Sequence, residues 1–233
     1  MTGEERLGMT TPNEENATTP ERKPLIIGPK GPSPIVTYVS TCCAVMSVMA
    51  SAMGNFRVAI ALLVASGVLD SFDGRFASMF ERDGDAREFG RWIDSLSDVV
   101  AFGIAPATLA MSVSLVAVTP AVVALSSVTS CLYVVATVHR LAWHGAISGD
   151  GEGPGNGFRG VPVTYASLAF LGTVLACTLL GAPRMVTSVA LAVCEAIMAF
   201  LFVWDVPVPR LGTKGLMALS IIGVALAVVL LVV

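Results

Sequence analysis

The chain has 233 residues, of which 55% are hydrophobic and 13% are charged, and its mean hydropathy is +0.78. Because so few polar residues cannot cover a water-soluble globule, the composition indicates an integral membrane protein. The net charge of −3 says little, because membrane proteins organise charge by side of the bilayer. The sequence has no nucleic-acid-binding footprint, so we expect no nucleic-acid partner.

The N-terminal segment differs in composition from everything that follows. Residues 1–33 are polar, contain five glutamates and repeat Pro and Thr, so they do not form the apolar core of a signal peptide. We expect residues 1–33 to be a disordered cytoplasmic tail. Residues 34–205 would form the main transmembrane domain, and residues 206–233 an additional C-terminal transmembrane helix.

Seven apolar stretches follow the tail, and each approaches the length of about 20 residues that crosses a bilayer. The predicted fold class is therefore all-α, a polytopic membrane helix bundle. The five cysteines lie inside these stretches without CxxC spacing, and we interpret them as packing residues. The predicted spans lie near 34–54, 57–80, 92–115, 119–140, 161–181, 184–204 and 213–233.

Lys and Arg residues predict the orientation, because cytoplasmic loops of membrane proteins carry most of them. With the N-terminus in the cytoplasm, 12 of the 14 lie inside, and only Arg57 and Arg184 lie outside. The polar stretches 81–91 and 139–159 then also face the cytoplasm. We interpret the first as the link between two helices and the second as either a lid or a solvated linker.

Four aspartates stand at the ends of the second and third apolar runs, as Asp70-x-x-Asp73-Gly74 and Asp94-x-x-x-Asp98. Carboxylates at a membrane boundary are costly, and these spacings put each pair on one face of its helix. Hard oxygen ligands without nearby His or Cys favour Mg²⁺, Mn²⁺ or Ca²⁺. Since Mg²⁺ usually binds substrate phosphates as well, the pattern predicts a phosphate or diphosphate site. The alternative is a charge network with neighbouring arginines that holds no metal.

Small residues accompany the aspartates at one-turn intervals. Gly74 and Ala77 follow Asp73, and Gly90 precedes Asp94 by one turn. They either leave a slot for a ligand or only allow close helix packing, which is common in membranes.

The run Asp70-Ser-Phe-Asp73-Gly74-Arg-Phe-Ala77, followed by Gly90-Arg-Trp-Ile-Asp94-Ser-Leu-Ser-Asp98, resembles the signature of the CDP-alcohol phosphatidyltransferases. The resemblance implies a homodimer of six-helix cores in which the seventh span is an addition. It implies that Asp70, Asp73 and Asp94 hold one or two Mg²⁺ or Mn²⁺ ions that clamp the diphosphate of CDP-diacylglycerol. Asp98 would complete the second metal site and act as the general base.

The resemblance also implies contacts with the CDP-lipid. The candidates are Gly74, Ala77, Ser78, Arg82 and Gly90. The chain departs from the family pattern at Ser78, where the family has an arginine, and in a longer linker before Gly90. Arg82, one turn after Ser78, would restore the cation if the helix continues that far.

Beyond the signature, the run Asp98-Val99-Val-Ala-Phe102-Gly103-Ile-Ala-Pro106 is similar to the version found in phosphatidylserine synthases. Two further segments, Arg140-Leu-Ala and Phe158-Arg-Gly-Val-Pro162, are similar to theirs as well, although Trp143 and Gly145 depart from the first. The implied acceptor is L-serine, and the implied products are phosphatidylserine and CMP.

The carboxylate of serine requires a cation, and we expect Arg140 to supply it, with Arg159 as the second candidate. Either arginine is alternatively a positive-inside anchor. Glu195 is an acid in the middle of the sixth span to which the sequence assigns no role.

Other functions stay open. Within the same chemistry, the acceptor is alternatively glycerol 3-phosphate or an inositol phosphate, and the donor an ether-lipid CDP compound. A membrane prenyltransferase also uses two aspartate-rich motifs, and a cation carrier would use the aspartates as a transport site, although no internal repeat is visible. We expect the protein in the cell (inner) membrane, with its N-terminus and active site on the cytoplasmic side.

Overall fold

The computed structural model describes residues 35–78, 84–117, 119–149, 158–159, 161–205, 207–208 and 213–232. The predicted tail at residues 1–33 and the candidate Arg82 lie outside this part of the chain. The helices are α1 (Ile35–Ala52), α2 (Phe56–Ser78), α3 (Gly84–Asp98), the π-helix η1 (Val99–Ile104), α4 (Ala105–Ala117), α5 (Pro120–Gly149), α6 (Tyr165–Leu179), α7 (Arg184–Val203) and α8 (Thr213–Val232).

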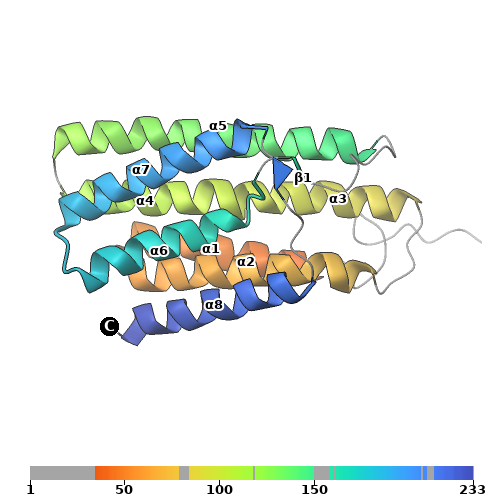
Figure 1. The fold of residues 1–233 in the computed structure, drawn as a ribbon, viewed down its shortest axis with the longest axis horizontal. Helices are drawn as coiled ribbons and strands as arrows, with labels where there is room; N and C mark the ends of the chain where they lie inside the picture. The colour runs from red at the N-terminus through yellow and green to blue at the C-terminus, as the bar shows by residue number, and fades with distance from the viewer. Residues whose placement is uncertain are drawn as a thin grey trace, which may run out of the picture.

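These helices lie side by side along the long axis of the molecule, and α3, η1 and α4 form one continuous rod (Figure 1). Each predicted span contains a helix, so the prediction of an all-α polytopic bundle is confirmed. Among the described residues, four helices are long and apolar enough to cross a membrane by length and composition: 35–52, 86–117, 120–146 and 184–203. Helix α6 and residues 217–232 of α8 are apolar but shorter.

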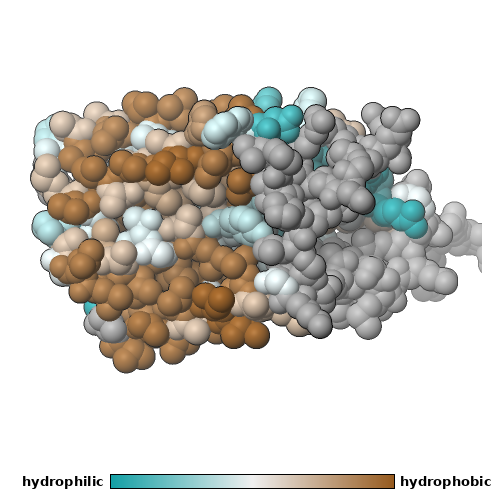
Figure 2. Space-filling model, in the orientation of Figure 1, coloured by the Kyte–Doolittle hydropathy of each residue, from teal (hydrophilic) through white to brown (hydrophobic). Residues whose placement is uncertain are grey.

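The distribution of side chains fits a lipid environment. Helix α1 turns small residues such as Ser40, Ala44 and Ser47 inward, while Met46 and Met49 are exposed. Hydrophobic residues also cover most of the coloured part of the face in Figure 2. Because helices in lipid gain little from burying large apolar groups, small inward residues that allow close packing are typical of membrane bundles.

Hydroxyl groups join the helices that carry the aspartates to α1. Ser47 donates to the carbonyl oxygen of Ala59 in α2 at 2.7 Å. Thr41 and Ser97 share a hydrogen bond of 2.5 Å between their hydroxyls, which links α1 to α3. Helix α1 therefore packs against both aspartate-bearing helices.

Two polar stretches that the sequence left outside the spans are helical. Helix α3 begins at Gly84, so most of residues 81–91 extend the third span and do not form a linker. Helix α5 continues to Gly149, so residues 139–149 extend the fourth span as a helix and are not a solvated linker, while residues 150–157 of this stretch lie outside the described part of the chain. Both corrections have one physical reason: residues 84–91 and 139–149 contain no proline, so a helix can continue beyond the apolar region.

The segments after α5 and α7 meet in a short antiparallel pair. Strand β1 (Phe158–Arg159) pairs with β2 (Pro207–Val208), with Phe158 opposite Val208. Helix α8 follows β2 and packs against α2 and α6. The division of the chain at residue 205 stays a prediction.

Candidate metal centre

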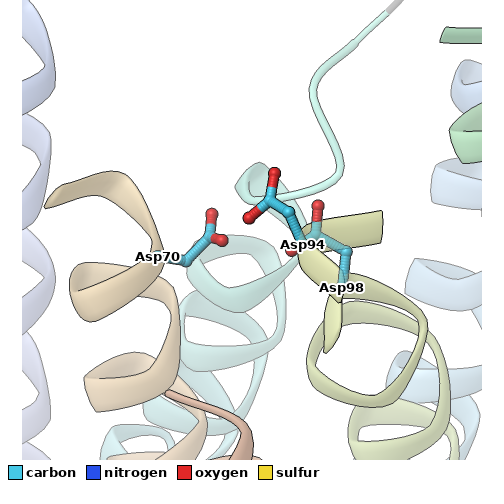
Figure 3. Close-up of side chains that lie close together, drawn as sticks. All are labelled: Asp70, Asp94 and Asp98. Atoms are coloured by element: carbon cyan, nitrogen blue, oxygen red, sulfur yellow. The ribbon is translucent and has the colours of Figure 1, made fainter. Parts of the chain in front are cut away.

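Three of the four predicted aspartates converge in space. Asp70 lies near the end of α2, and Asp94 and Asp98 lie one turn apart on α3. Each offers a carboxylate oxygen, and these oxygens all lie within 4.8 Å of one another. Figure 3 shows Asp70 pointing from α2 toward Asp94 and Asp98.

The carboxylates at this centre need a counter-charge. Two like charges 4.8 Å apart repel each other by about 3 kcal/mol at the effective dielectric typical near a protein surface. All three aspartates are partly buried, and one oxygen of Asp98 is fully buried, so water screens the repulsion incompletely. An all-carboxylate set of ligands suits Mg²⁺ or Mn²⁺, so the residues fit the ions that the sequence predicts.

The remaining candidates around the centre are described to different extents. Asp73, Gly74, Ala77 and Ser78 belong to the last turns of α2, but their side-chain surroundings lie outside the described part of the chain. Gly90 lies on α3, one turn before Asp94, and is partly buried.

The two candidate serine-binding arginines occupy different positions. Arg140 lies on α5, is only 6% exposed and donates from Nε to the carbonyl oxygen of Val161 at 3.3 Å. Asp205 lies close enough for its opposite charge to act on Arg140. Arg159 is in β1, and its side-chain surroundings are outside the described part of the chain.

Arg140 faces a pocket between α5 and the C-terminal end of α7. The pocket has a volume of about 250 Å³ and combines cationic, anionic and aromatic side chains. Such a mixture suits a small polar molecule that carries both charges. The pocket is lined by His139, Arg140, Trp143, Phe202, Val203, Trp204 and Asp205.

A second crevice lies between α2, α6 and α8, beside the turn that carries Asp70. Ser71 and Gly67 of α2 line it, opposite Ser167 of α6 and Gly223 of α8. Its walls are mostly apolar, with several hydroxyl groups. A lipid that reaches the aspartates through this crevice would contact α8 as well as the helices of the predicted core.

Glu195 lies apart from the aspartates, on α7, and is fully buried. Its carboxyl oxygens form hydrogen bonds with the hydroxyls of Thr129 at 2.6 Å and Ser130 at 2.8 Å, both on α5. The sequence left this residue without a role, and the structure identifies it as a polar contact between α5 and α7.

The sequence analysis also missed the π-helix η1, which begins directly after Asp98. π-Helical turns are rare and occur often at functional sites. The signal in the sequence was Pro106, because a proline inside a helix disrupts the hydrogen bond one turn before it.

Comparisons with known proteins agree with the signature. A sequence model of the CDP-alcohol phosphatidyltransferase family matches residues 33–233. The chain is 29% identical over 181 residues to the CDP-diacylglycerol–serine O-phosphatidyltransferase of Mycobacterium leprae, which covers 76% of this chain and 58% of that protein.

Two further relatives match a shorter part of the chain. The enzyme of the same name from Mycobacterium tuberculosis is 33% identical over 140 residues, which cover 59% of this chain and 46% of that protein. The archaetidylserine synthase of Methanothermobacter thermautotrophicus is 28% identical over 134 residues, which cover 58% of this chain and 53% of that protein. The matched region thus spans about half the length of these relatives.

Proposed function

The chain belongs to the CDP-alcohol phosphatidyltransferase family, and from that premise we propose that it transfers a phosphatidyl group from CDP-diacylglycerol to L-serine. The convergence of Asp70, Asp94 and Asp98 from two helices carries this proposal, since it creates the ligand set that a metal-bound diphosphate requires. The names of the mycobacterial relatives support serine as the acceptor.

The aspartates would hold the metal. Asp70, Asp94 and Asp98, with Asp73 from the same helix as Asp70, would bind one or two Mg²⁺ or Mn²⁺ ions. When bound, the metal supplies Lewis-acid stabilisation of the charge on the diphosphate. Without it, the clustered carboxylates would repel the anionic donor.

Asp98 would act as the general base. It would take the proton from the serine hydroxyl while that oxygen forms a bond to the phosphorus of the phosphatidyl group and the bond from phosphorus to CMP breaks.

The donor lipid would lie along α2. The crevice beside Gly67 and Ser71 would bind part of the diacylglycerol. The CDP group would contact the small residues of the signature. Those residues are Gly74, Ala77, Ser78 and Gly90, with Arg82 as the expected cation.

The serine would bind near Arg140. In the pocket between α5 and the C-terminal end of α7, Arg140 supplies a charge that matches the serine carboxylate, and the nearby Asp205 matches its ammonium group. Arg159 is the second candidate for the carboxylate. Because Arg140 is almost fully buried, a solvated positive-inside anchor explains it less well.

The setting of the enzyme follows from the same proposal. The aspartates would face the cytoplasm, where CDP-activated substrates occur, and the protein would act as a homodimer in the cell membrane. Strand β1 follows α5 and β2 follows α7, so their pairing brings the segments after these two helices together. This supports a position of both segments on the same side of the membrane, as the distribution of Lys and Arg predicts.

An ether-lipid CDP donor is a second candidate, supported by the similarity to the archaetidylserine synthase. The apolar crevice alone does not distinguish fatty acyl chains from ether-linked chains. The reaction at phosphorus and the roles of the aspartates would be unchanged.

The test is CMP release by the purified full chain in detergent, with Mn²⁺ or Mg²⁺ and either CDP-diacylglycerol or its ether-lipid counterpart. Parallel reactions contain L-serine, glycerol 3-phosphate or inositol phosphate, and an Asp98→Asn variant is the control. We expect release that requires serine and that is abolished in the control. Release with another alcohol would overturn the serine assignment, and no release from folded protein with any alcohol would overturn the proposed reaction.

A further inference from the structure

The rod that carries Asp94 and Asp98 changes its helical form immediately after Asp98. Residues Val99–Ile104 form the π-helix η1, and the N–H of Ala105 donates to the carbonyl oxygen of Val100, five residues earlier. A π-turn contains an extra residue relative to an α-helix, and one residue corresponds to a rotation of about 100°. The form of this turn therefore decides which way Asp94 and Asp98 face relative to α4.

Pro106 accounts for the irregular turn. In an α-helix the carbonyl of Phe102 would accept from the N–H of residue 106, but proline has no N–H and its ring crowds that carbonyl. Since Phe102 is fully buried, its carbonyl needs a donor from within the protein.

Tyr133 of α5 provides that donor. Its hydroxyl donates a hydrogen bond to the carbonyl oxygen of Phe102. The Tyr133 ring is fully buried, with Phe170 and Phe202 packed at centroid distances of 5.7 and 5.8 Å. These aromatic contacts hold the ring independently of the hydroxyl, so the hydroxyl can be removed without emptying the site.

The same turn contacts α5 and α2 at two further points. Gly103 packs against Thr137, and a Cβ at Gly103 would lie 3.4 Å from Thr137 Cγ2. The Phe102 ring lies against Gly67 on α2, where an added Cβ would be 3.4 Å from Phe102 Cε1. Gly67 precedes Asp70 by three residues, so Phe102 connects the turn after Asp98 to the helix turn that carries Asp70.

We propose that Tyr133 is a positioning residue for the aspartate centre. By binding the Phe102 carbonyl, its hydroxyl holds the π-turn that orients Asp94 and Asp98 toward Asp70. This inference rests on the proposed function in one respect, since the three aspartates must bind a divalent metal for their orientation to matter.

The test is the affinity of the purified, full-length protein for Mn²⁺ alone, measured from the electron paramagnetic resonance of free Mn²⁺ during a titration. Tyr133→Phe should weaken Mn²⁺ binding about 10-fold, as loss of a group that orients metal ligands typically does. Ser47→Ala is the matched control, because it also removes a buried hydroxyl that donates to a carbonyl of another helix. It should lower the thermal stability to a similar extent and leave Mn²⁺ affinity unchanged.

A second variant protects the test against a folding failure of Tyr133→Phe. Gly103→Val keeps the tyrosine hydroxyl, but its Cβ would already be in contact with Thr137 Cγ2 at 3.4 Å, so its two added methyl groups should crowd Thr137, shift the turn and weaken Mn²⁺ binding in the same direction. Equal Mn²⁺ affinity in wild-type protein and both variants would overturn the role of Tyr133 and of the π-turn. Wild-type protein that binds no Mn²⁺ would instead overturn the metal centre of the proposed function.

Discussion

Two groups of carboxylates in this bundle, the aspartate centre on α2 and α3 and Glu195 on α7, have different partners. Asp70, Asp94 and Asp98 bring three carboxylate oxygens within 4.8 Å of one another. Glu195 instead meets two hydroxyls, from Thr129 and Ser130. One arrangement concentrates negative charge that a cation would neutralise, and the other satisfies a single acid with hydrogen bonds.

The contacts of Glu195 are complete if the acid is neutral. The Thr129 hydroxyl lies 2.6 Å from Glu195 and 3.1 Å from the carbonyl oxygen of Ser126, yet it has only one proton to donate. A protonated Glu195 would supply the second proton, so Thr129 would serve both contacts. The comparison teaches that burial and partners, and not the mere presence of a carboxylate, distinguish the proposed metal ligands from an acid that joins two helices through hydrogen bonds.

The largest effect is expected at the aspartate centre. Asp70→Asn removes one charge from the ligand set, and we expect at least about a 100-fold loss of CMP release, since loss of groups that merely orient metal ligands already costs 10–100-fold. The variant should fold, because one mutual repulsion is relieved. CMP release and thermal unfolding of the same preparation would check this, and a folded variant with wild-type activity would contradict the comparison.

Metal addition and removal should affect the aspartate centre alone. Mn²⁺ at 100 times its Kd should stabilise wild-type protein by about 2.7 kcal/mol, because it binds only the folded state. Asp94→Asn should show little of this stabilisation, whereas Glu195→Gln should keep all of it. The measurement is thermal unfolding in detergent with Mn²⁺ or with EDTA. Equal protection of all three proteins would place the metal elsewhere.

Arg140 extends the comparison to a buried cation. Arg140→Ala should raise the KM for serine about 10-fold, since a charge-assisted hydrogen bond contributes about 1.5–3 kcal/mol. The KM for CDP-diacylglycerol should change much less. Steady-state kinetics with each substrate varied in turn would check the prediction, and equal increases in both KM values would show that Arg140 supports the fold and not serine binding.

The smallest effect is expected at Glu195. Glu195→Gln should leave activity within about two-fold of wild type, because an amide can donate to Thr129 and accept from Ser130, as a neutral acid does. Glu195→Ala should instead lower the free energy of unfolding by about 1–3 kcal/mol, since it leaves buried hydroxyls without their partner. Denaturation and CMP release would be measured for both variants, and a large loss of activity in stable Glu195→Gln protein would give this acid a functional role.

The sequence by itself determined the elements that depend on local order along the chain. Apolar runs of about 20 residues identify helices that cross a bilayer, and a spacing of four residues puts Asp94 and Asp98 on one helix face. It did not reveal that polar residues 84–91 and 141–149 continue the helices, because a helix that extends beyond the apolar region shows no apolar run there.

Only the tertiary structure decided how the helices meet. Asp70 joins the pair on α3 because α1 packs against both helices, and Phe102 occupies the space that Gly67 leaves on α2. Tyr133 reaches the Phe102 carbonyl across 31 residues, and Glu195 meets Ser130 across 65. Such contacts depend on which faces of distant helices come together. The spacing of residues within one helix does not predict which helix will pack against it.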